Sequence, residues 1–541
     1  MNEFNLVTVT DILRRPKNFH EVECVDPDET LKPNAVFRAK IFRNESGLLV
    51  RSFRHGGGNF RLERTAIKLD LEDPIRLFEQ IECVARTGSL PDIFVWGESL
   101  VHIGVNGTLR AITAVSAPII LGRLMSFYTL KNVKDDWVRV RAELPDRLVK
   151  AFLEKADWDL PKLTGMIHCP YFYGGEIVQT EGYNHKSGLY LSKNFKLAGI
   201  KNVSREDALK VVDYLKSVLN GFPFEYDVDL AVALALMVTA VQRATLEKAP
   251  MFGISACTPG SGKTQLATGC ASLSNGVEAS VHGFRDDEAE LSKMLMAVLM
   301  KGDPHLILDN VKLGVALGGD ALCAVLSSAV YAGRELGFSR IREVSTRILM
   351  IATGNNLKLD SDSTRRTLKI NLDAKQERPE LRSFDKTFVQ ICIDDREVIL
   401  SAVLTILSAY HEAGSPKVGN VRLGSFERWS DQVCAPLVWL GVIDPVKGLA
   451  LAESDAGVSS LGELLLIWRD NLGNCPVTTS EAMANPAVAA FFKAEFDDRN
   501  GATTRKVGNH ITKYAGRIID GCRLIKWGTR QRAVVWQFEA V

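Results

Sequence analysis

The chain has 541 residues, which is long for one domain and indicates about three or four. Hydrophobic residues make up 46% and charged residues 24%, as in an ordinary soluble globular protein with sizeable cores. The formal net charge is +1, so any surface for nucleic acid must be local. The ten cysteines are scattered without a C-x-x-C pair, which argues against a zinc site and fits a reducing cytosol.

No segment of the sequence marks the chain for export or for a membrane. The first 20 residues carry charges throughout and lack the apolar core of a signal peptide. The longest apolar run, 230–241, is too short to span a bilayer and predicts a buried helix. A cytoplasmic protein without a membrane partner is therefore expected.

The first 221 residues contain no catalytic constellation. Residues 1–66 predict a small β-rich unit in which apolar and basic positions alternate. That alternation indicates either a weak nucleic-acid contact or a solvated sheet face. Residues 67–221 predict a mixed α+β region, with strands near 93–96 and 100–105 and a helix near 146–155.

Residues 222–385 alternate between strands and helices, which predicts an α/β unit. An apolar strand leads there into a Pro-Gly turn, a Gly-Lys-Thr sequence and a helix. Backbone N–H groups of such a turn favour phosphate, with Lys263 on the β/γ phosphates and Thr264 on Mg²⁺. Cys257 stands where the usual pattern has its first glycine, and the alternative is a glycine turn after a buried strand. The residues predicted to bind the nucleotide are Thr258, Pro259, Gly260, Ser261, Gly262, Lys263, Thr264 and Gln265.

Later strands of the same unit end in, or follow, polar residues. Asp309 ends an apolar strand at the edge where Mg²⁺ would lie, and it is predicted to hold the ion through water. Asn355 ends the next apolar strand, where its amide could orient the attacking water. Arg365 and Arg366 suit a finger that neutralises charge on a neighbouring subunit's nucleotide. Each residue alone is a common strand cap or a solvated charge, but the ordered set predicts an ATP-hydrolysing core.

Two further parts of the chain are predicted to serve this core. Apolar and polar residues alternate on either side of Gly337 over 334–346, which predicts a β-hairpin that carries Arg340 and Arg342. Residues 386–456 predict a helical lid on the nucleotide core, with tryptophans that belong to the hydrophobic interior.

Residues 457–541 predict a separate domain of winged-helix type, with three helices followed by a two-stranded hairpin. In that arrangement the third helix enters the DNA major groove and the wing touches the backbone. Eight Lys or Arg residues stand against two acidic residues in 501–541, which favours contact with phosphates. The alternative is a domain that docks on protein. The residues predicted to contact DNA here are Arg505, Lys506, Lys513, Arg517, Arg530 and Arg532.

The ordered motifs resemble those of the phage and mobile-element primase-helicase proteins, which are AAA+ ATPases close to superfamily-3 DNA helicases. The motifs that carry the resemblance are Thr258-Pro-Gly-Ser-Gly-Lys-Thr264, Ile307-Leu-Asp-Asn-Val311, Ala352-Thr-Gly-Asn-Asn356 and Thr364-Arg-Arg366, and shorter matches extend it over most of 150–541. The resemblance implies an AAA+ parallel-sheet core, with Lys263 and Thr264 as the Walker A pair and Asp309 as the Walker B residue. It also implies that Asn355 is the sensor, that Arg365 or Arg366 is the finger, and that the 334–346 hairpin tracks DNA in the pore of a ring, usually a hexamer.

The sequence departs from the family pattern in two places. Asn310 stands where such proteins commonly carry a second carboxylate, the general base. Because an amide cannot take a proton at neutral pH, either Asp309 or another carboxylate acts as the base, or turnover is slow. Only about 150 residues precede the matching region, without zinc ligands or a polymerase carboxylate triad, so a separate primase or polymerase partner is expected.

The sequence therefore predicts an ATP- and Mg²⁺-dependent helicase or translocase, a homo-oligomeric ring acting on single-stranded or duplex DNA. Its expected context is the replication of a phage, prophage or mobile element. One alternative is an origin-binding initiator switch with slow ATP turnover. The other is an AAA+ ATPase that acts on protein in phage defence.

Overall fold

The computed structural model describes residues 64–541 with short gaps and, before residue 64, only the backbone of four strands. The gaps are residues 87–92, 105–107, 135, 198–199, 201, 313–314, 336–340, 377, 383–384, 450–458, 497–501, 517–518, 520, 532 and 541. The predictions for Arg340, Arg517 and Arg532, and for the Lys513 side chain, lie outside the described residues. The four early strands, β1 (Glu23–Val25), β2 (Phe37–Asn44), β3 (Gly47–Ser52) and β4 (Asn59–Arg61), pair antiparallel in chain order.

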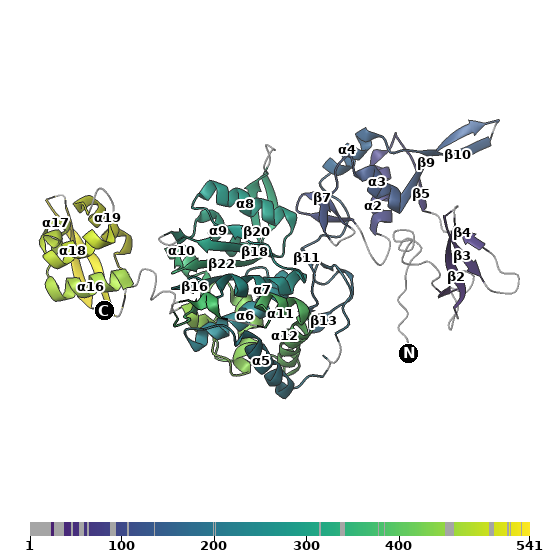
Figure 1. Cartoon of the computed structure of the whole chain (residues 1–541). Coiled ribbons are helices and arrows are strands. Elements are labelled where there is room, and N and C mark those ends of the chain that lie inside the picture. The colour runs from purple at the N-terminus through teal and green to yellow at the C-terminus, as the bar shows by residue number, and fades with distance from the viewer. Residues whose placement is uncertain are drawn as a thin grey trace.

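Residues 64–160 form an α+β unit with its own core. Helices α2 (Pro74–Arg86), α3 (Ala117–Leu124) and α4 (Asp146–Glu154) share one hydrophobic cluster. Strands β6 (Ile93–Trp96), β7 (Ser99–Ile103) and β8 (Leu109–Ala111) form one sheet, and β5 (Thr65–Lys68), β9 (Met125–Val133) and β10 (Asp136–Ala142) form a second. The β9–β10 hairpin extends well beyond this core (Figure 1).

The segment 161–221 leads into the α/β core. It contains five short strands, β11 (Gly165–Ile167), β12 (Tyr171–Tyr173), β13 (Glu176–Val178), β14 (Gly182–Asn184) and β15 (Leu189–Leu191). The sequence Ser204-Arg-Glu-Asp207 predicts a helix N-cap. The structure confirms it, since Ser204 and Asp207 form a reciprocal capping box at the start of α5 (Arg205–Leu219). The run Asp227–Thr245 is long and apolar enough to cross a membrane, but 89% of its window is buried inside the protein. Its helical part, α6 (Asp227–Gln242), is therefore a core helix, as predicted.

The α/β core is built on a fully parallel sheet of five strands. In spatial order they are β17 (His282–Gly283), β18 (His305–Val311), β22 (Leu349–Asn355), β16 (Met251–Ala256) and β24 (Thr367–Leu372). The two middle strands, β22 and β16, are almost wholly buried, which explains their near-continuous apolar sequences. The sequence also predicts a strand near 279–284, but only His282 and Gly283 pair with β18.

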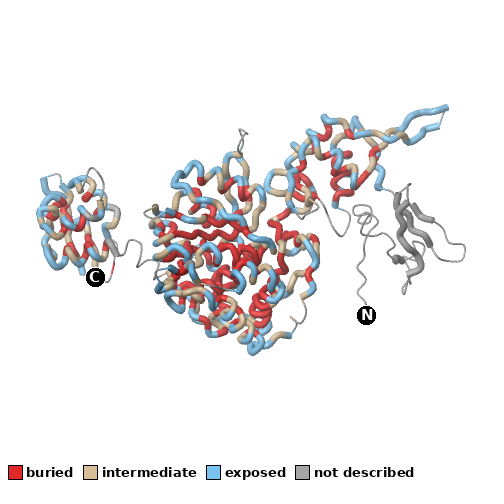
Figure 2. The backbone as a smooth tube through the Cα atoms, in the orientation of Figure 1, coloured by how far each residue is buried: buried red, intermediate tan, exposed pale blue. Residues whose placement is uncertain are grey.

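Helices cover both faces of this sheet. Alternate strand residues such as Phe252 and Ile351 share a core with α6 and α7 (Lys263–Asn275), whereas Met251 and Leu306 share a core with α8 (Glu288–Lys301) and α9 (Asp320–Ser327). Figure 2 shows the buried strands between these two layers. The three layers place the carboxyl ends of β18, β22 and β16 at one edge.

The predicted helical lid packs directly on the first of these layers. Its helices are α11 (Phe388–Asp394), α12 (Arg396–Glu412), α13 (Glu427–Trp429) and α14 (Ala435–Trp439), with a π-helical turn, η5 (Ser430–Cys434), before α14. The sequence predicts a helix over 426–440, and the chain is helical from Glu427 to Trp439. The turn η5 within it is π-helical, because Pro436 supplies no N–H for a regular helical bond. Trp429 is fully buried and donates to Thr239 Oγ1 at 2.9 Å, so the expected interior position is confirmed.

Residues 459–540 form a separate unit with a core of its own. Its elements are α16 (Ser459–Asn471), β25 (Val477–Thr478), α17 (Thr479–Ala484), α18 (Pro486–Glu495), α19 (Thr504–Tyr514), β26 (Cys522–Arg530) and β27 (Ala533–Ala540). The sequence predicts a second helix capped by Ser480-Glu481, but the N-cap is Thr478, which forms a capping box with Glu481, and the helix is divided at Pro486. It also predicts a third helix over 505–519, but the helix ends at Tyr514.

Candidate nucleotide-binding site

The predicted phosphate loop connects β16 directly to α7. Gly260 and Gly262 have φ angles of 74° and 100°, a left-handed region that glycine adopts without strain. A Cβ atom on Gly262 would lie 3.1 Å from Phe222 Cε1. Glycine is therefore needed at this position both for the turn and for the close approach of Phe222.

The loop is held by hydrogen bonds of its own. Ser261 is buried and its hydroxyl donates to the Thr258 carbonyl at 2.7 Å. Lys263 Nζ donates to the same carbonyl at 3.3 Å, and burial lowers the pKa of this ammonium. The ammonium thus lies on the loop with only a carbonyl as acceptor, and a phosphate oxygen could take over that bond.

Two threonine hydroxyls converge on the carboxylate that ends the apolar part of β18. Thr264 Oγ1 donates to Asp309 Oδ1 at 2.8 Å, and Thr353 Oγ1 donates to the same oxygen at 2.6 Å. Asp309 is close enough to Thr264 for both to hold one Mg²⁺, directly or through water, together with phosphate oxygens. Within the described residues no group of three His, Cys, Asp or Glu side chains could hold a metal ion. A cation here would therefore depend on the phosphates.

Asn310 occupies a bulge in β18. The pairing of β18 with β22 shifts register between Leu308 and Val311, and Asn310 has a φ of 58°. Its backbone N–H donates to Thr353 Oγ1 at 3.1 Å. Asparagine is among the residues that tolerate this left-handed conformation best. The left-handed backbone at this position therefore favours asparagine, the residue that replaces the expected second carboxylate.

Asn355 ends β22, the strand that lies between the loop strand β16 and the Asp309 strand β18. Its register partner is Ala256, the last residue of β16. The amide oxygen of Asn355 is buried and has no hydrogen-bond partner. An unsatisfied buried acceptor costs about 1–3 kcal/mol, so this oxygen favours a donor such as a water molecule or a ligand.

A cavity of about 660 Å³ opens beside the phosphate loop. It is lined by Gly260, Gly262 and Gln265 and by residues from the end of α5 and the start of α11. Arg382 Nη2 donates to the Ser261 carbonyl at 3.4 Å, so a residue distant in sequence contacts the loop. The cavity has room for the nucleoside part of a nucleotide. Sequence reasoning missed the other residues that line it, among them Tyr214, Phe222, Arg382 and Phe388.

The two candidate finger arginines lie at the opposite edge of the sheet. Both precede β24, and the Arg366 carbonyl accepts from the N–H of Met251, the first residue of β16. A six-residue strand spans about 20 Å, so neither side chain reaches the phosphate loop of its own chain.

The two arginines differ in their own contacts. Arg366 is 15% exposed and donates to Ser327 Oγ at 2.7 Å, whereas Arg365 is 63% exposed and, among the described residues, pairs only with Asp362, at 3.0 Å. An exposed surface pair of this kind is weak. Arg365 is therefore the member of the pair that is open to a neighbouring molecule.

The predicted hairpin is present, as β20 (Val330–Arg334) and β21 (Ile341–Ser345). It begins before the predicted start at residue 334, because Val330 already pairs with Ser345. Arg342 Nε lies 2.5 Å from a Glu335 carboxylate oxygen, and its guanidinium also contacts Ser99 of β7. With 16% exposure, this predicted DNA contact is occupied by protein partners in the structure.

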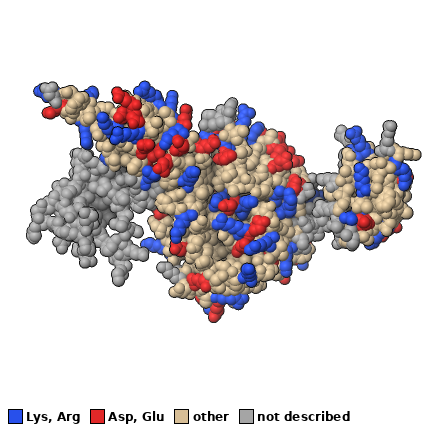
Figure 3. Space-filling model, turned by 180° about the vertical axis from the view of Figure 1, so that it is seen from behind, with Lys and Arg blue, Asp and Glu red and all other residues tan. Residues whose placement is uncertain are grey.

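In the C-terminal unit, the described candidate DNA contacts lie on α19 and the hairpin. Arg505 is exposed in the first turn of α19, and Lys506 is partly exposed beside it. Arg530 is exposed and pairs with Glu481 at 3.2 Å. Lys and Arg outnumber Asp and Glu on the visible face of this unit (Figure 3). The local excess of positive charge expected from the sequence therefore reaches the surface.

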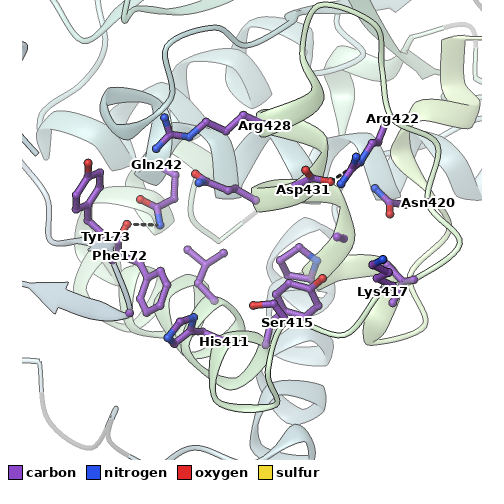
Figure 4. A pocket seen from close by; sticks show the side chains of 18 residues that line it. Phe172, Tyr173, Gln242, His411, Ser415, Lys417, Asn420, Arg422, Arg428 and Asp431 are labelled. Carbon is purple, nitrogen blue, oxygen red and sulfur yellow. Dashed lines mark hydrogen bonds and ion pairs between the residues drawn. The ribbon is translucent and has the colours of Figure 1, made fainter.

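A second and larger cavity, of about 910 Å³, lies away from the phosphate loop. It is bounded by the β12–β13 turn, by α12 and by the loop that follows α12 (Figure 4). Gln242 donates from Nε2 to the Phe172 carbonyl at 3.2 Å, while its buried Oε1 has no partner. Arg422 pairs with Asp431 at 2.9 Å on another wall. None of the predicted site residues lines this cavity, so it is separate from the nucleotide site.

Comparisons with known proteins give distant likenesses only. No protein family and no curated protein matches the sequence. Among solved structures, the apo A form of the NrS-1 C-terminal region is 12% identical, with a TM-score of 0.38 over 86% of this chain and 99% of that chain. A JCV helicase structure is also 12% identical, with a TM-score of 0.21 over 49% of this chain and 72% of that one. Scores this low carry no weight for fold or function.

Proposed function

We propose that this protein is an ATP-dependent DNA helicase or translocase of AAA+ type, close to the superfamily-3 motors and active as a ring, with a hexamer as the expected form. The observation that carries the proposal is the convergence of Lys263, Thr264, Asp309 and Asn355 at one edge of a parallel sheet. Ligands of α/β proteins bind at this carboxyl edge. Its assumed context is replication of a phage, prophage or mobile element.

The site assigns a task to each of its side chains. Lys263 would leave the Thr258 carbonyl and hold the β- and γ-phosphate oxygens. Thr264 and Asp309 would hold Mg²⁺, which supplies charge neutralisation when bound. The unpaired amide oxygen of Asn355 would accept a hydrogen bond from the attacking water and so orient it.

The proposed finger acts between subunits. Because Arg365 lies at the far edge of its own sheet, it could stabilise transition-state charge only on the nucleotide of a neighbouring subunit. Such a finger is worth about 10³–10⁵ in rate in other nucleotide hydrolases. Hydrolysis would therefore require assembly, which fits the proposed ring.

A second candidate is an ATP-controlled initiator switch that binds duplex DNA through its C-terminal unit. Asn310 favours it, because the residue beside Asp309 cannot act as a base. The order α16, β25, α17, α18, α19, β26, β27, with a three-stranded sheet, supports a winged-helix arrangement for that unit. Under the third alternative, an ATPase acting on protein, DNA would not stimulate hydrolysis.

A strand-displacement assay with the full chain separates these functions. A motor unwinds a tailed duplex in the presence of ATP and Mg²⁺, and Lys263→Ala abolishes the unwinding. A switch binds the duplex with salt-sensitive affinity and displaces nothing. Unwinding that persists in Lys263→Ala would show that the phosphate loop does not drive the reaction.

A further inference from the structure

The β9–β10 hairpin is a free two-stranded ribbon for most of its length. The third strand, β5, pairs with β9 only from Met125 to Tyr128. From Thr129 onward, β9 pairs with β10 alone, in an unbroken antiparallel register up to the turn. Figure 1 shows the ribbon projecting from the 64–160 unit. An isolated two-stranded ribbon is only marginally stable in water, so an exposed one suits contact with a partner.

The register sorts the side chains of this ribbon onto two faces. Directly paired residues share a face, and successive residues alternate between faces. One face, here named the Trp137 face, consists of Tyr128, Leu130, Asn132, Trp137, Arg139 and Arg141. The opposite face consists of Thr129, Lys131, Val133, Asp136, Val138 and Val140.

The Trp137 face combines exposed aromatic and cationic groups. Trp137 is 68% exposed, which is unusual for so large an apolar side chain. The guanidinium carbon of Arg139 lies 4.8 Å from the centre of the Tyr128 ring, in a cation–π contact. Arg139 and Arg141 are exposed, and among the described residues neither lies within ion-pair distance of a carboxylate. The described acid of the free ribbon, Asp136, is on the opposite face.

These groups form a straight row along β10. Trp137, Arg139 and Arg141 alternate with residues of the other face, so they follow one another at intervals of about 7 Å. Single-stranded nucleic acid is held by just this combination, since bases stack on aromatic rings while cations follow the phosphates. An acidic peptide would use the arginines but would leave Trp137 without a stacking partner.

We propose that the Trp137 face of the β9–β10 ribbon binds single-stranded DNA, with a base stacked on Trp137 and the backbone following Arg139 and Arg141. The inference shares with the proposed function only the choice of DNA as partner, because it concerns a separate surface and needs no ATP. It gives the 64–160 unit, which has no catalytic constellation, a role as an arm that holds the strand.

The test is a DNA-binding titration of the full chain without nucleotide. A fluorescently labelled oligo(dT) is titrated by anisotropy at low salt with the wild type, Trp137→Ala and the double variant Arg139→Glu/Arg141→Glu. We expect Kd to rise about fivefold or more for Trp137→Ala, as for other base-stacking residues, and by about tenfold or more for the double variant. The matched control is Lys131→Glu, an exposed cation of the same ribbon on the opposite face, which should change Kd by about twofold at most.

Three results would overturn the inference. The first is an unchanged Kd in both variants of the Trp137 face. The second is a loss of DNA affinity in Lys131→Glu as large as that in the double variant, since the effect would then come from the charge of the ribbon as a whole and not from one face. The third is a change of oligomeric mass, measured by light scattering, in the variants of the Trp137 face while Kd per subunit is unchanged. The ribbon would then be a contact between copies of this chain. ATP hydrolysis without DNA should be equal in all variants, and its absence from the wild type would contradict the proposed function alone.

Discussion

The buried amide oxygen of Asn355 is the residue-scale feature that most closely joins structure to chemistry. It has no partner among the described residues, although it lies at the edge shared by the phosphate loop and Asp309. Asn355→Ala should slow ATP hydrolysis by about 10²-fold or more, the usual effect of losing a positioned polar group. Nucleotide affinity should change little, because the loop contacts are intact.

The same substitution should leave the protein as stable as before, or raise its thermal midpoint, because an unsatisfied acceptor is removed. Paired measurements of kcat and of the melting temperature test this. A variant that loses activity only because it unfolds would contradict the assigned role.

Arg365 and Arg366 provide a matched pair of substitutions. Arg365→Ala should lower the hydrolysis rate and leave stability within about 0.5 kcal/mol, since its partner among the described residues is the exposed Asp362. Arg366→Ala should instead destabilise the protein by about 1–2 kcal/mol, because its guanidinium bonds to Ser327 and to the Asp362 carbonyl. Urea denaturation and ATPase rates on both variants check the contrast. If Arg366→Ala lowers the hydrolysis rate and Arg365→Ala lowers the stability instead, Arg366 is the finger.

At the scale of elements, Gly269 determines how closely α7 approaches α11. A Cβ atom on Gly269 would overlap the ring of Phe388, which also lines the cavity beside the phosphate loop. Gly269→Ala should therefore destabilise the protein by about 1–3 kcal/mol despite the better helix propensity of alanine. Gly122→Ala is the control, because Gly122 lies in α3 with open space around its Cβ position, and it should be neutral or stabilising.

Asp229 links the start of α6 to the end of β24. Its carboxylate accepts from the N–H groups of Tyr226 at 2.9 Å and Asn371 at 2.8 Å. Burial nevertheless raises the pKa of Asp229 from 3.8 to about 6, so the folded state binds this proton more tightly than the unfolded state. The resulting stabilisation is fully present below about pH 4 and is lost as the pH rises through 6.

Urea denaturation across this range measures the effect. The unfolding free energy should fall by up to about 3 kcal/mol between pH 4 and pH 7 on account of this group. Asp229→Asn should remove that part of the slope. An equal slope in wild type and variant would show that Asp229 titrates alike in the folded and unfolded states.

The elements that could be predicted from the sequence are those marked by a pattern within a short stretch of the chain. The apolar strands β16, β18 and β22 and the glycine turn could be located because periodicity and motif are properties of short stretches. The parallel sheet brings Asp309 within hydrogen-bond distance of Thr264, and Asn355 ends the strand between the Asp309 strand and the loop strand. The π-helical turn η5 and the shortness of β17 were missed, because local sequence patterns do not determine such irregularities or the exact ends of elements.

Other site features depend on contacts between distant segments. Arg382 reaches the Ser261 carbonyl from a position 121 residues away, and no pattern around it indicates that contact. Likewise, the alternation of residues along β9 or β10 does not identify a DNA-binding face, because the register between the two strands decides which side chains share a face. The protein partners of Arg342 also appear only once β7 is packed against the hairpin.

At the scale of the whole molecule, an intermolecular finger predicts that each nucleotide site is shared between two chains. Lys263→Ala and Arg365→Ala should each be inactive alone. A mixture of the two should regain part of the activity, because some interfaces then combine an intact loop with an intact arginine. ATPase rates after mixing and reassembly test this. A mixture that stays inactive would place the finger within the chain or elsewhere.

The proposed function requires that the Lys263 site hydrolyses ATP to act on DNA. The most direct measurement is the steady-state ATP hydrolysis rate of the full chain with Mg²⁺, with and without single-stranded DNA, for the wild type and Lys263→Ala. We expect hydrolysis by the wild type, a severalfold rise on adding single-stranded DNA, and no activity in Lys263→Ala. A rate that is unaffected by DNA, or that survives in Lys263→Ala, would contradict the claim.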